Sequence, residues 1–140
     1  MVEVEGYKLP DGLLYSKDHM WARMEGDLAR VGLTDYGQHI AGKIVFSRMR
    51  PKGPVAQGKP VGTIETAKWV GALKSPVTGE IGEANPDLKS QPRLINEDPY
   101  GKGWLVTVKP SQLETDKANL MPALQAAEWL REEVSKEKKK

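Results

Sequence analysis

Residues 60–81 read PVGTIETAKWVGALKSPVTGEI and place two similar runs, 60–64 and 76–81, on either side of Lys68. Each run starts with proline and continues with β-branched residues, a composition typical of a short strand. Two such strands around one turn predict a β-hairpin with residues 66–69 at its tip. The side chain of Lys68 would then point into solvent.

Lys68 is a candidate attachment site because of this expected position. At a hairpin tip, an enzyme that acylates amines can reach the end of the four-carbon stem, whereas a lysine inside a strand is inaccessible. An amide removes the positive charge, so an attached arm would be neutral. The plainer alternative is that a lysine in a turn only improves solubility. The residues alone leave both open.

Similar short runs occur along the rest of the chain, which carries 14 glycines and 10 prolines. We expect strands, joined by tight turns, at residues 28–33, 43–46, 60–65, 77–81 and 104–108. In the last of these, one face would carry Trp104, Val106 and Val108. The other face would carry Leu105 and Thr107, as in a half-buried strand. The pattern predicts a mainly β fold, either a sandwich or a barrel.

Two segments break the β pattern. Residues 34–41 predict a short internal helix with Thr34 or Asp35 as its N-cap. Near the C-terminus, apolar residues recur close to helical spacing: Leu120, Leu124, Ala127 and Leu130. This spacing predicts a C-terminal helix over about residues 121–134. The lysine-rich residues 135–140 are expected to form a frayed, solvated tail.

The composition fits a single domain of residues 1–140 with a core of about residues 7–130. A formal net charge of +2 does not indicate a nucleic-acid binder. The absence of cysteine excludes thiol catalysis and a disulfide framework, and two histidines make a metal site improbable. The sequence shows neither a signal peptide nor an apolar run of about 20 residues that could span a membrane, so we expect a cytoplasmic protein.

Motifs of independent enzymes are also missing. The sequence contains neither a glycine-rich phosphate loop before a helix nor a Gly-x-Ser-x-Gly elbow, and its two histidines have no obvious nucleophile to activate. We therefore expect a protein that is not itself a catalyst.

Several segments, in one order and with matching spacing, resemble the H proteins of the glycine cleavage system from about Tyr7 to Leu130. The matching segments are Tyr15-Ser-Lys-Asp-His-Met-Trp21, Val31-Gly-Leu-Thr-Asp-Tyr-Gly-Gln38, Gly42-Lys-Ile-Val-Phe46, Ile64-Glu-Thr-Ala-Lys68, Ser75-Pro-Val-Thr-Gly-Glu-Ile81 and Leu94-Ile-Asn-Glu-Asp-Pro-Tyr-Gly-Lys-Gly-Trp104. One segment would be a weak signal, but the ordered set is specific. The resemblance implies a barrel-sandwich hybrid, the fold of lipoyl domains, and a carrier protein.

The resemblance also implies a cofactor and its site. Lipoate would be amide-linked to the lysine of the family's Glu-Ser-Val-Lys motif, which reads Glu65-Thr-Ala-Lys68 here. Glu65 and Gly79 fall where the family has residues that help lipoylation. Glu65 could equally be a surface charge, and Gly79 a turn glycine with positive φ. The expected partners are a lipoate ligase or transferase, a pyridoxal-phosphate glycine decarboxylase, a folate-dependent aminomethyltransferase and dihydrolipoyl dehydrogenase.

In the family, the loaded arm folds into a cleft on the H protein. The resemblance places that arm cleft at Asp18, His19, Met20, Tyr36 and Ala72. Two of these positions depart from the family, because Met20 and Ala72 stand where it has acids. A cationic aminomethyl load should prefer nearby carboxylates, whereas an apolar cleft suits a load without an ammonium group.

A basic strip, residues 43–59, is a second departure, and Lys43 replaces the family's usual Asp. The strip contains five cations and no acid: Lys43, Arg48, Arg50, Lys52 and Lys59. It fits either a solvated strand edge or a docking surface. The departures keep open a second kind of carrier, an H-like lipoate-binding protein that carries sulfur for a heterodisulfide-reductase-like complex. An unmodified interaction module is a third alternative.

Overall fold

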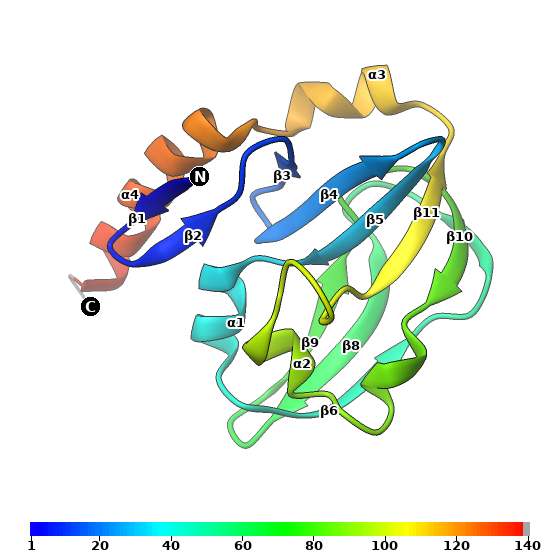
Figure 1. The fold of residues 1–140 in the computed structure, drawn as a ribbon, viewed down its shortest axis with the longest axis horizontal. Helices are drawn as coiled ribbons and strands as arrows, with labels where there is room; N and C mark the ends of the chain where they lie inside the picture. Colours follow the sequence, from blue (N-terminus) through cyan, green and yellow to red (C-terminus); the bar gives the residue numbers. More distant parts are fainter. Residues whose placement is uncertain (139–140) are drawn as a thin grey trace.

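The computed structural model describes residues 1–138 and confirms a mainly β fold with a short internal helix and a C-terminal helix (Figure 1). The strands are β1 (Val2–Val4), β2 (Tyr7–Leu9), β3 (Leu14–Tyr15), β4 (Met20–Glu25), β5 (Leu28–Leu33), β6 (Ile44–Met49), β7 (Gly53–Val55), β8 (Pro60–Thr66), β9 (Val70–Lys74), β10 (Gly79–Ala84) and β11 (Val106–Pro110). The helical segments are α1 (Asp35–Ala41), η1 (Pro86–Leu88), α2 (Leu94–Glu97), α3 (Leu113–Asp116), η2 (Lys117–Asn119) and α4 (Ala123–Lys138). Of the helices within residues 1–138, none is long and apolar enough to cross a membrane.

The strands pair in three antiparallel sheets. A six-stranded sheet has the order β3-β4-β5-β11-β10-β7, a three-stranded sheet has the order β6-β8-β9, and β1 pairs with β2 alone. The two larger sheets enclose a common core, to which Val31 and Val108 contribute from one sheet and Ile64 and Leu73 from the other. Burying a side chain of this size stabilises a fold by about 1.5–3 kcal/mol. The β8–β9 hairpin is therefore anchored on the core through one face.

The predicted hairpin around residues 66–69 is present, but its second arm is not the one that the sequence analysis expects. β8 pairs with β9, in the register Glu65 to Val70 and Ile64 to Gly71. The run at residues 76–81 instead enters β10, which pairs with β7 and β11 in the other sheet. The two Pro-led runs are similar because each leads into a strand, but the first strand belongs to the three-stranded sheet and the second to the six-stranded sheet.

β11 differs from the half-buried strand that its alternation predicts. It lies inside the six-stranded sheet between β5 and β10, and Val106, Thr107 and Val108 are all buried. The polar member of this run is accommodated because the Thr107 hydroxyl accepts a hydrogen bond from the Glu83 N–H (3.1 Å). Strands covered on both faces lose the simple alternation of apolar and polar positions.

The internal helix α1 begins as predicted. Thr34 is the N-cap, and its hydroxyl accepts the Gly37 N–H at 3.0 Å, which satisfies one of the free donors of the first turn. Gly42 ends the helix with φ of 87°, a backbone conformation that favours glycine. The helix thus occupies residues 35–41 between β5 and β6.

The C-terminal helix α4 packs against the β1–β2 hairpin at one end of the molecule (Figure 1). Its buried side chains are Ala123, Ala126, Ala127, Leu130 and Val134, whereas Leu124 is 75% exposed. Leu124 therefore does not belong to the core face, contrary to the predicted spacing. The helix also continues past the predicted end at residue 134 to Lys138, so most of the predicted tail is helical. Residues 139–140 of that tail lie outside the described part of the chain.

Candidate functional site

The tip of the β8–β9 hairpin is a tight turn closed at Thr66 and Trp69. The Thr66 N–H donates to the Trp69 carbonyl at 2.9 Å. The Thr66 hydroxyl accepts the N–H groups of Lys68 (3.2 Å) and Trp69 (3.4 Å). Because a serine or threonine hydroxyl can organise a turn in this way, Thr66 fixes the backbone of the tip. Sequence reasoning missed this role, although a threonine just before a turn is a recognisable signal for it.

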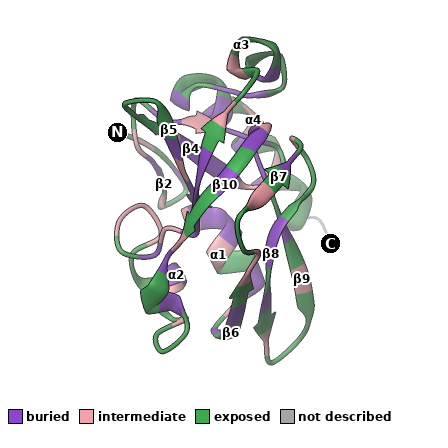
Figure 2. Ribbon diagram, turned by 90° about the vertical axis from the view of Figure 1, so that its right-hand side faces the viewer, coloured by how far each residue is buried: buried purple, intermediate pink, exposed green. Residues whose placement is uncertain are grey.

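Lys68 lies at this tip and is exposed, as the sequence predicts. The burial pattern changes from alternating along β8 to exposed at residues 67–70 (Figure 2). Among the ion pairs formed within residues 1–138, none involves Lys68. The backbone of Lys68 is thus held by Thr66 while its amine stays accessible, and this arrangement suits a point of covalent attachment.

Glu65 lies three residues before Lys68 on the outward-facing side of β8. Its register partners are Phe46 on β6 and Val70 on β9, and all three side chains are exposed. A ligase that approaches the tip would meet Glu65 beside Lys68, so the position fits both proposed roles of this residue.

Gly79 is the first residue of β10. The chain reaches it after β9, which leads away from the hairpin tip. It pairs with Val55 on one side and Pro110 on the other, and a Cβ there would come within 2.0 Å of the Lys109 carbonyl oxygen. Its φ is not positive, so the predicted turn conformation is wrong. Glycine is required because two strands approach closely, and Gly79 does not lie beside Lys68.

His19 and Tyr36, two residues of the predicted arm cleft, lie together. Their ring centroids are 5.3 Å apart, and the His19 ring also lies 5.1 Å from Trp129 of α4. Burial lowers the pKa of His19 below its usual value, against the opposing influence of Glu133 and Asp18. The Asp18 side chain is exposed next to this cluster.

Met20 and Ala72, the other two residues of the predicted arm cleft, lie elsewhere. Met20 is 0% exposed and belongs to the core between the two larger sheets. Ala72 is exposed on β9, where it is the register partner of Thr63. The five predicted cleft residues therefore do not share one surface, and the cleft itself stays a prediction.

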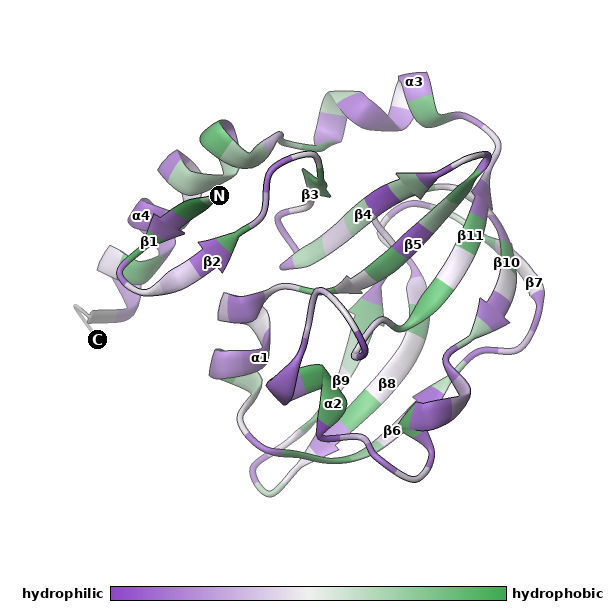
Figure 3. Cartoon of the chain, in the orientation of Figure 1, coloured by the Kyte–Doolittle hydropathy of each residue, from purple (hydrophilic) through white to green (hydrophobic). Residues whose placement is uncertain are grey.

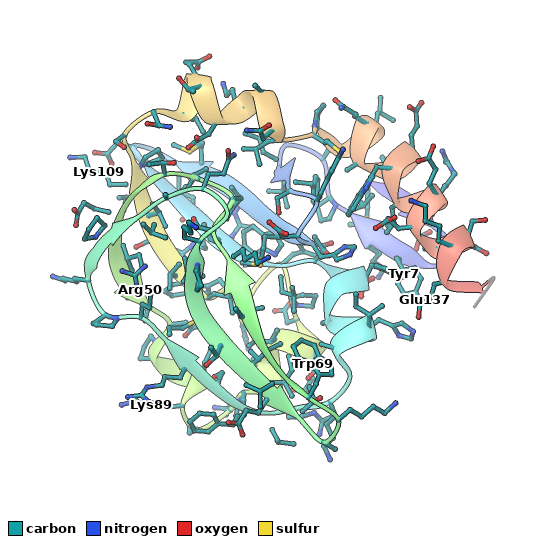
Figure 4. The ribbon with its side chains drawn as sticks, turned by 180° about the vertical axis from the view of Figure 1, so that it is seen from behind. Tyr7, Arg50, Trp69, Lys89, Lys109 and Glu137 are labelled. Atoms are coloured by element: carbon teal, nitrogen blue, oxygen red, sulfur yellow. The ribbon has the colours of Figure 1, made fainter. Side chains whose placement is uncertain are left out.

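Trp69 follows Lys68 in the turn, and its ring lies over Gly71 near the start of β9 (Figure 4). A Cβ built on Gly71 would lie 1.5 Å from Cζ3 of the Trp69 ring, so the indole covers the space that a side chain at position 71 would need. The ring remains 40% exposed. Gly71 thus permits a large apolar side chain to rest directly beside the exposed lysine.

These features define a class of protein: a small β scaffold that displays one lysine at the tip of an anchored hairpin, as a carrier domain does.

Within residues 1–138, His, Asp and Glu side chains form no group of three or more that could hold a metal ion. Asp116, which is buried, has a structural role, because its carboxylate accepts the Thr78 N–H (2.6 Å) and the Gln112 side-chain amide (3.2 Å).

Comparison with known proteins identifies the family. The family model described as glycine cleavage H-protein matches residues 13–133. A probable glycine cleavage system H protein 2 from Sulfurisphaera tokodaii is 43% identical over 143 residues, covering 99% of this chain and 96% of that protein. The glycine cleavage system H protein of Rubrobacter xylanophilus is 47% identical over 106 residues, covering 75% of this chain and 84% of that protein.

A solved structure agrees. The crystal structure of a glycine cleavage system H protein from Mycobacterium marinum matches with a TM-score of 0.77 and 31% identity, covering 86% of this chain and 98% of that one. The chain belongs to the glycine cleavage H-protein family. Proteins of this family carry lipoate and are carrier subunits rather than catalysts, as the sequence predicts.

Proposed function

We propose that this protein is a lipoyl carrier of the glycine cleavage system, with lipoate amide-linked to Lys68. The observation that supports this most directly is the exposed Lys68 at the tip of an anchored hairpin, in the family's motif position. A lipoate ligase or transferase would form the amide by attack of the neutral Lys68 amine on an activated lipoyl donor, with loss of the donor's activating group and one amine proton.

The carried group is an aminomethyl group derived from glycine. Lys68 would hold the lipoyl arm, and the disulfide of that arm would supply the two-electron acceptor for the aminomethyl group that remains when a pyridoxal-phosphate decarboxylase removes the carboxylate of glycine as CO2. A folate-dependent aminomethyltransferase would then remove the group, and dihydrolipoyl dehydrogenase would reoxidise the dithiol.

A tether makes such a relay efficient. An arm anchored at Lys68 meets each docked active site at an effective concentration of the order of mM, without new contacts for every encounter. The hairpin supports this role because its inner face is packed on the core through Ile64 and Leu73 while its tip is exposed. The base of the arm is fixed, so only the arm moves.

The two alternatives receive less support. The matched family and relatives are named for glycine cleavage, which does not favour a sulfur-carrying protein for a heterodisulfide-reductase-like complex. An unmodified interaction module would leave unexplained why Glu65-Thr-Ala-Lys68 stands at the position of the family's lipoylation motif. Absence of acids at Met20 and Ala72 is the feature that favours sulfur, but Met20 is buried in the core.

The test is lipoylation followed by transfer. The wild-type protein, treated with a lipoate ligase, should gain one lipoyl increment in intact mass, Lys68→Arg should gain none, and the matched control Lys109→Arg should behave as wild type. The lipoylated protein should then support exchange of labelled CO2 into the carboxyl group of glycine on the decarboxylase encoded in the same genome. Modification at another lysine, or lipoylated protein without exchange, would overturn the proposal.

A further inference from the structure

The three-stranded sheet has one face that no other part of the described chain covers. Along β6, β8 and β9, the side chains that alternate with the buried ones are exposed, and they define what we call the outer face. The residues of the outer face are Phe46, Arg48, Thr63, Glu65, Val70, Ala72 and Lys74. Phe46, Glu65 and Val70 form a row across the three strands at the end next to Lys68.

At the end next to the hairpin tip, this surface carries exposed apolar side chains on both edge strands, with Glu65 of β8 between them. Phe46 is 50% exposed, Val70 is 66% exposed, and Val45, at the bulge next to Phe46, is 54% exposed. In Figure 3 the first part of β6 is coloured hydrophobic. An aromatic ring and two valines left in water are costly, because full burial of each would be worth about 1.5–3 kcal/mol. Grouped apolar side chains of this kind mark an interaction site more often than scattered ones do.

The surroundings of this apolar group are basic. Arg48 and Lys74 lie on the outer face itself, on its two edge strands, and Lys43 is exposed just before β6. None of these three cations belongs to an ion pair formed within residues 1–138. Glu65 is the single carboxylate among the residues of the outer face.

A cavity of about 610 Å3 continues this surface around the edge of β6. Phe46 and Arg48 line it on one side and Leu88 and Lys89 on the other; Lys89 is labelled in Figure 4. Arg50 also lines it, but its guanidinium already donates to the carbonyls of Pro54 (2.9 Å) and Pro60 (3.1 Å). The concave part thus also combines apolar side chains with the cations Arg48 and Lys89.

Edge protection does not account for Arg48 on β6 or Lys43 just before it. Charged side chains on an edge strand prevent pairing with another chain. The edge of β6, however, is already covered, because the Ser47 hydroxyl donates to the Leu88 carbonyl (3.2 Å) and the Ile44 N–H to the Asn96 side chain (2.9 Å). Protection would also not place Phe46 and Val70 in water on the same strands.

We propose that the outer face docks the pyridoxal-phosphate glycine decarboxylase, through a surface of that enzyme that offers apolar contacts to Phe46 and Val70 and carboxylates to Arg48 and Lys74. This inference rests on the proposed function and names the chemistry of the partner. Aromatic anchors such as Phe46 supply affinity, and rim charges such as Arg48 and Lys74 steer the encounter. Since the outer face ends at the hairpin tip, an enzyme bound there would have Lys68 and its arm at the entrance of the enzyme's active site.

The experiment measures glycine–CO2 exchange on the glycine decarboxylase of the same genome, with fully lipoylated carrier as the varied substrate. Phe46→Ser should raise KM for the carrier about tenfold with kcat nearly unchanged, as loss of a buried anchor does. Arg48→Glu with Lys74→Glu should raise KM about tenfold at low salt, and by far less at high salt. The matched controls are Leu124→Ser and Lys109→Glu with Arg131→Glu, which make the same changes on exposed residues elsewhere.

The outcomes separate two failures. If wild-type carrier supports exchange and the decarboxylase has the same KM for the outer-face variants as for wild type, the docking proposal is wrong while the carrier function stands. If lipoylated wild type supports no exchange, the function falls and the docking proposal falls with it. If sedimentation shows that wild type self-associates and the outer-face variants do not, the face belongs to a dimer, which also overturns the proposal. Intact mass confirms equal lipoylation of all variants.

Discussion

Replacement of Gly71 by alanine should displace the Trp69 ring beside the carrier lysine. A Cβ at position 71 would lie 1.5 Å from the Trp69 Cζ3 atom, far inside any contact distance, so the indole must leave the strand. Trp69 is 40% exposed. A large aromatic side chain buries about 250 Å2 at most, so roughly 150 Å2 of this ring is covered. If half of that area faces β9, displacement costs about 2 kcal/mol.

Alanine returns part of this cost, because it restricts the unfolded chain more than glycine does, by about 0.5–1 kcal/mol in a strand. We therefore expect Gly71→Ala to lower the free energy of unfolding by about 1 kcal/mol. The assay is urea denaturation, together with Trp69 fluorescence obtained by difference from Trp69→Phe. Emission should shift to longer wavelength as the ring enters water.

A double-mutant cycle decides whether the ring is the cause. In a Trp69→Ala background nothing occupies the space above Gly71, so Gly71→Ala should be neutral or stabilising, and the coupling between the two positions should be about 2 kcal/mol. A coupling below about 0.5 kcal/mol would show that the ring does not rest on Gly71. Lipoylation of Lys68 should be unchanged throughout, since Thr66 holds the backbone of the tip.

Two further predictions concern the predicted arm cleft. Burial lowers the pKa of His19 in the folded protein, so on acidification the unfolded chain binds a proton at this position before the folded protein does. The stability that neutral His19 contributes should therefore be complete above about pH 6.5, the usual pKa of histidine. It should be lost as the pH falls from that value toward the lower pKa of the folded state. Urea titrations from pH 5 to 8 should show this loss in wild type and a smaller one in His19→Gln, and equal slopes would contradict the burial argument. Met20→Glu should lower the free energy of unfolding by more than about 3 kcal/mol because it places a carboxylate in the core, whereas Ala72→Asp on the exposed strand should change it by less than about 0.5 kcal/mol. Near wild-type stability of Met20→Glu would show that position 20 opens to solvent.

The sequence predicts most of what depends on local patterns. The limits of β5, the N-cap at Thr34 and the exposed tip at residues 66–69 all follow from short-range signals such as β-branched runs, a capping hydroxyl and a turn. These features involve neighbours along the chain, so a pattern of a few residues contains the information.

Long-range pairing is not contained in such patterns. Residues 76–81 resemble residues 60–64, yet they enter different sheets, because the short β9 intervenes and closes the hairpin. Similarly, Met20 is predicted to line a cleft from its position after a motif histidine, but whether its side chain faces the core depends on the register of β4 with β5. Register is set by the packing of whole sheets.

The two faces of the β8–β9 hairpin have different roles in the proposed function, because one fixes the backbone near Lys68 and the other is exposed. The inner face of the hairpin is fixed in the core, and the turn is closed by the Thr66 hydroxyl, so the Cα of Lys68 is a fixed point. On the outer face, Phe46 and Val70 are exposed on either side of Glu65. In the proposed complex, the decarboxylase covers these two side chains. An arm on Lys68 would then start at the edge of that interface, so the proposed docking and the proposed transfer depend on neighbouring residues of β6, β9 and the hairpin tip.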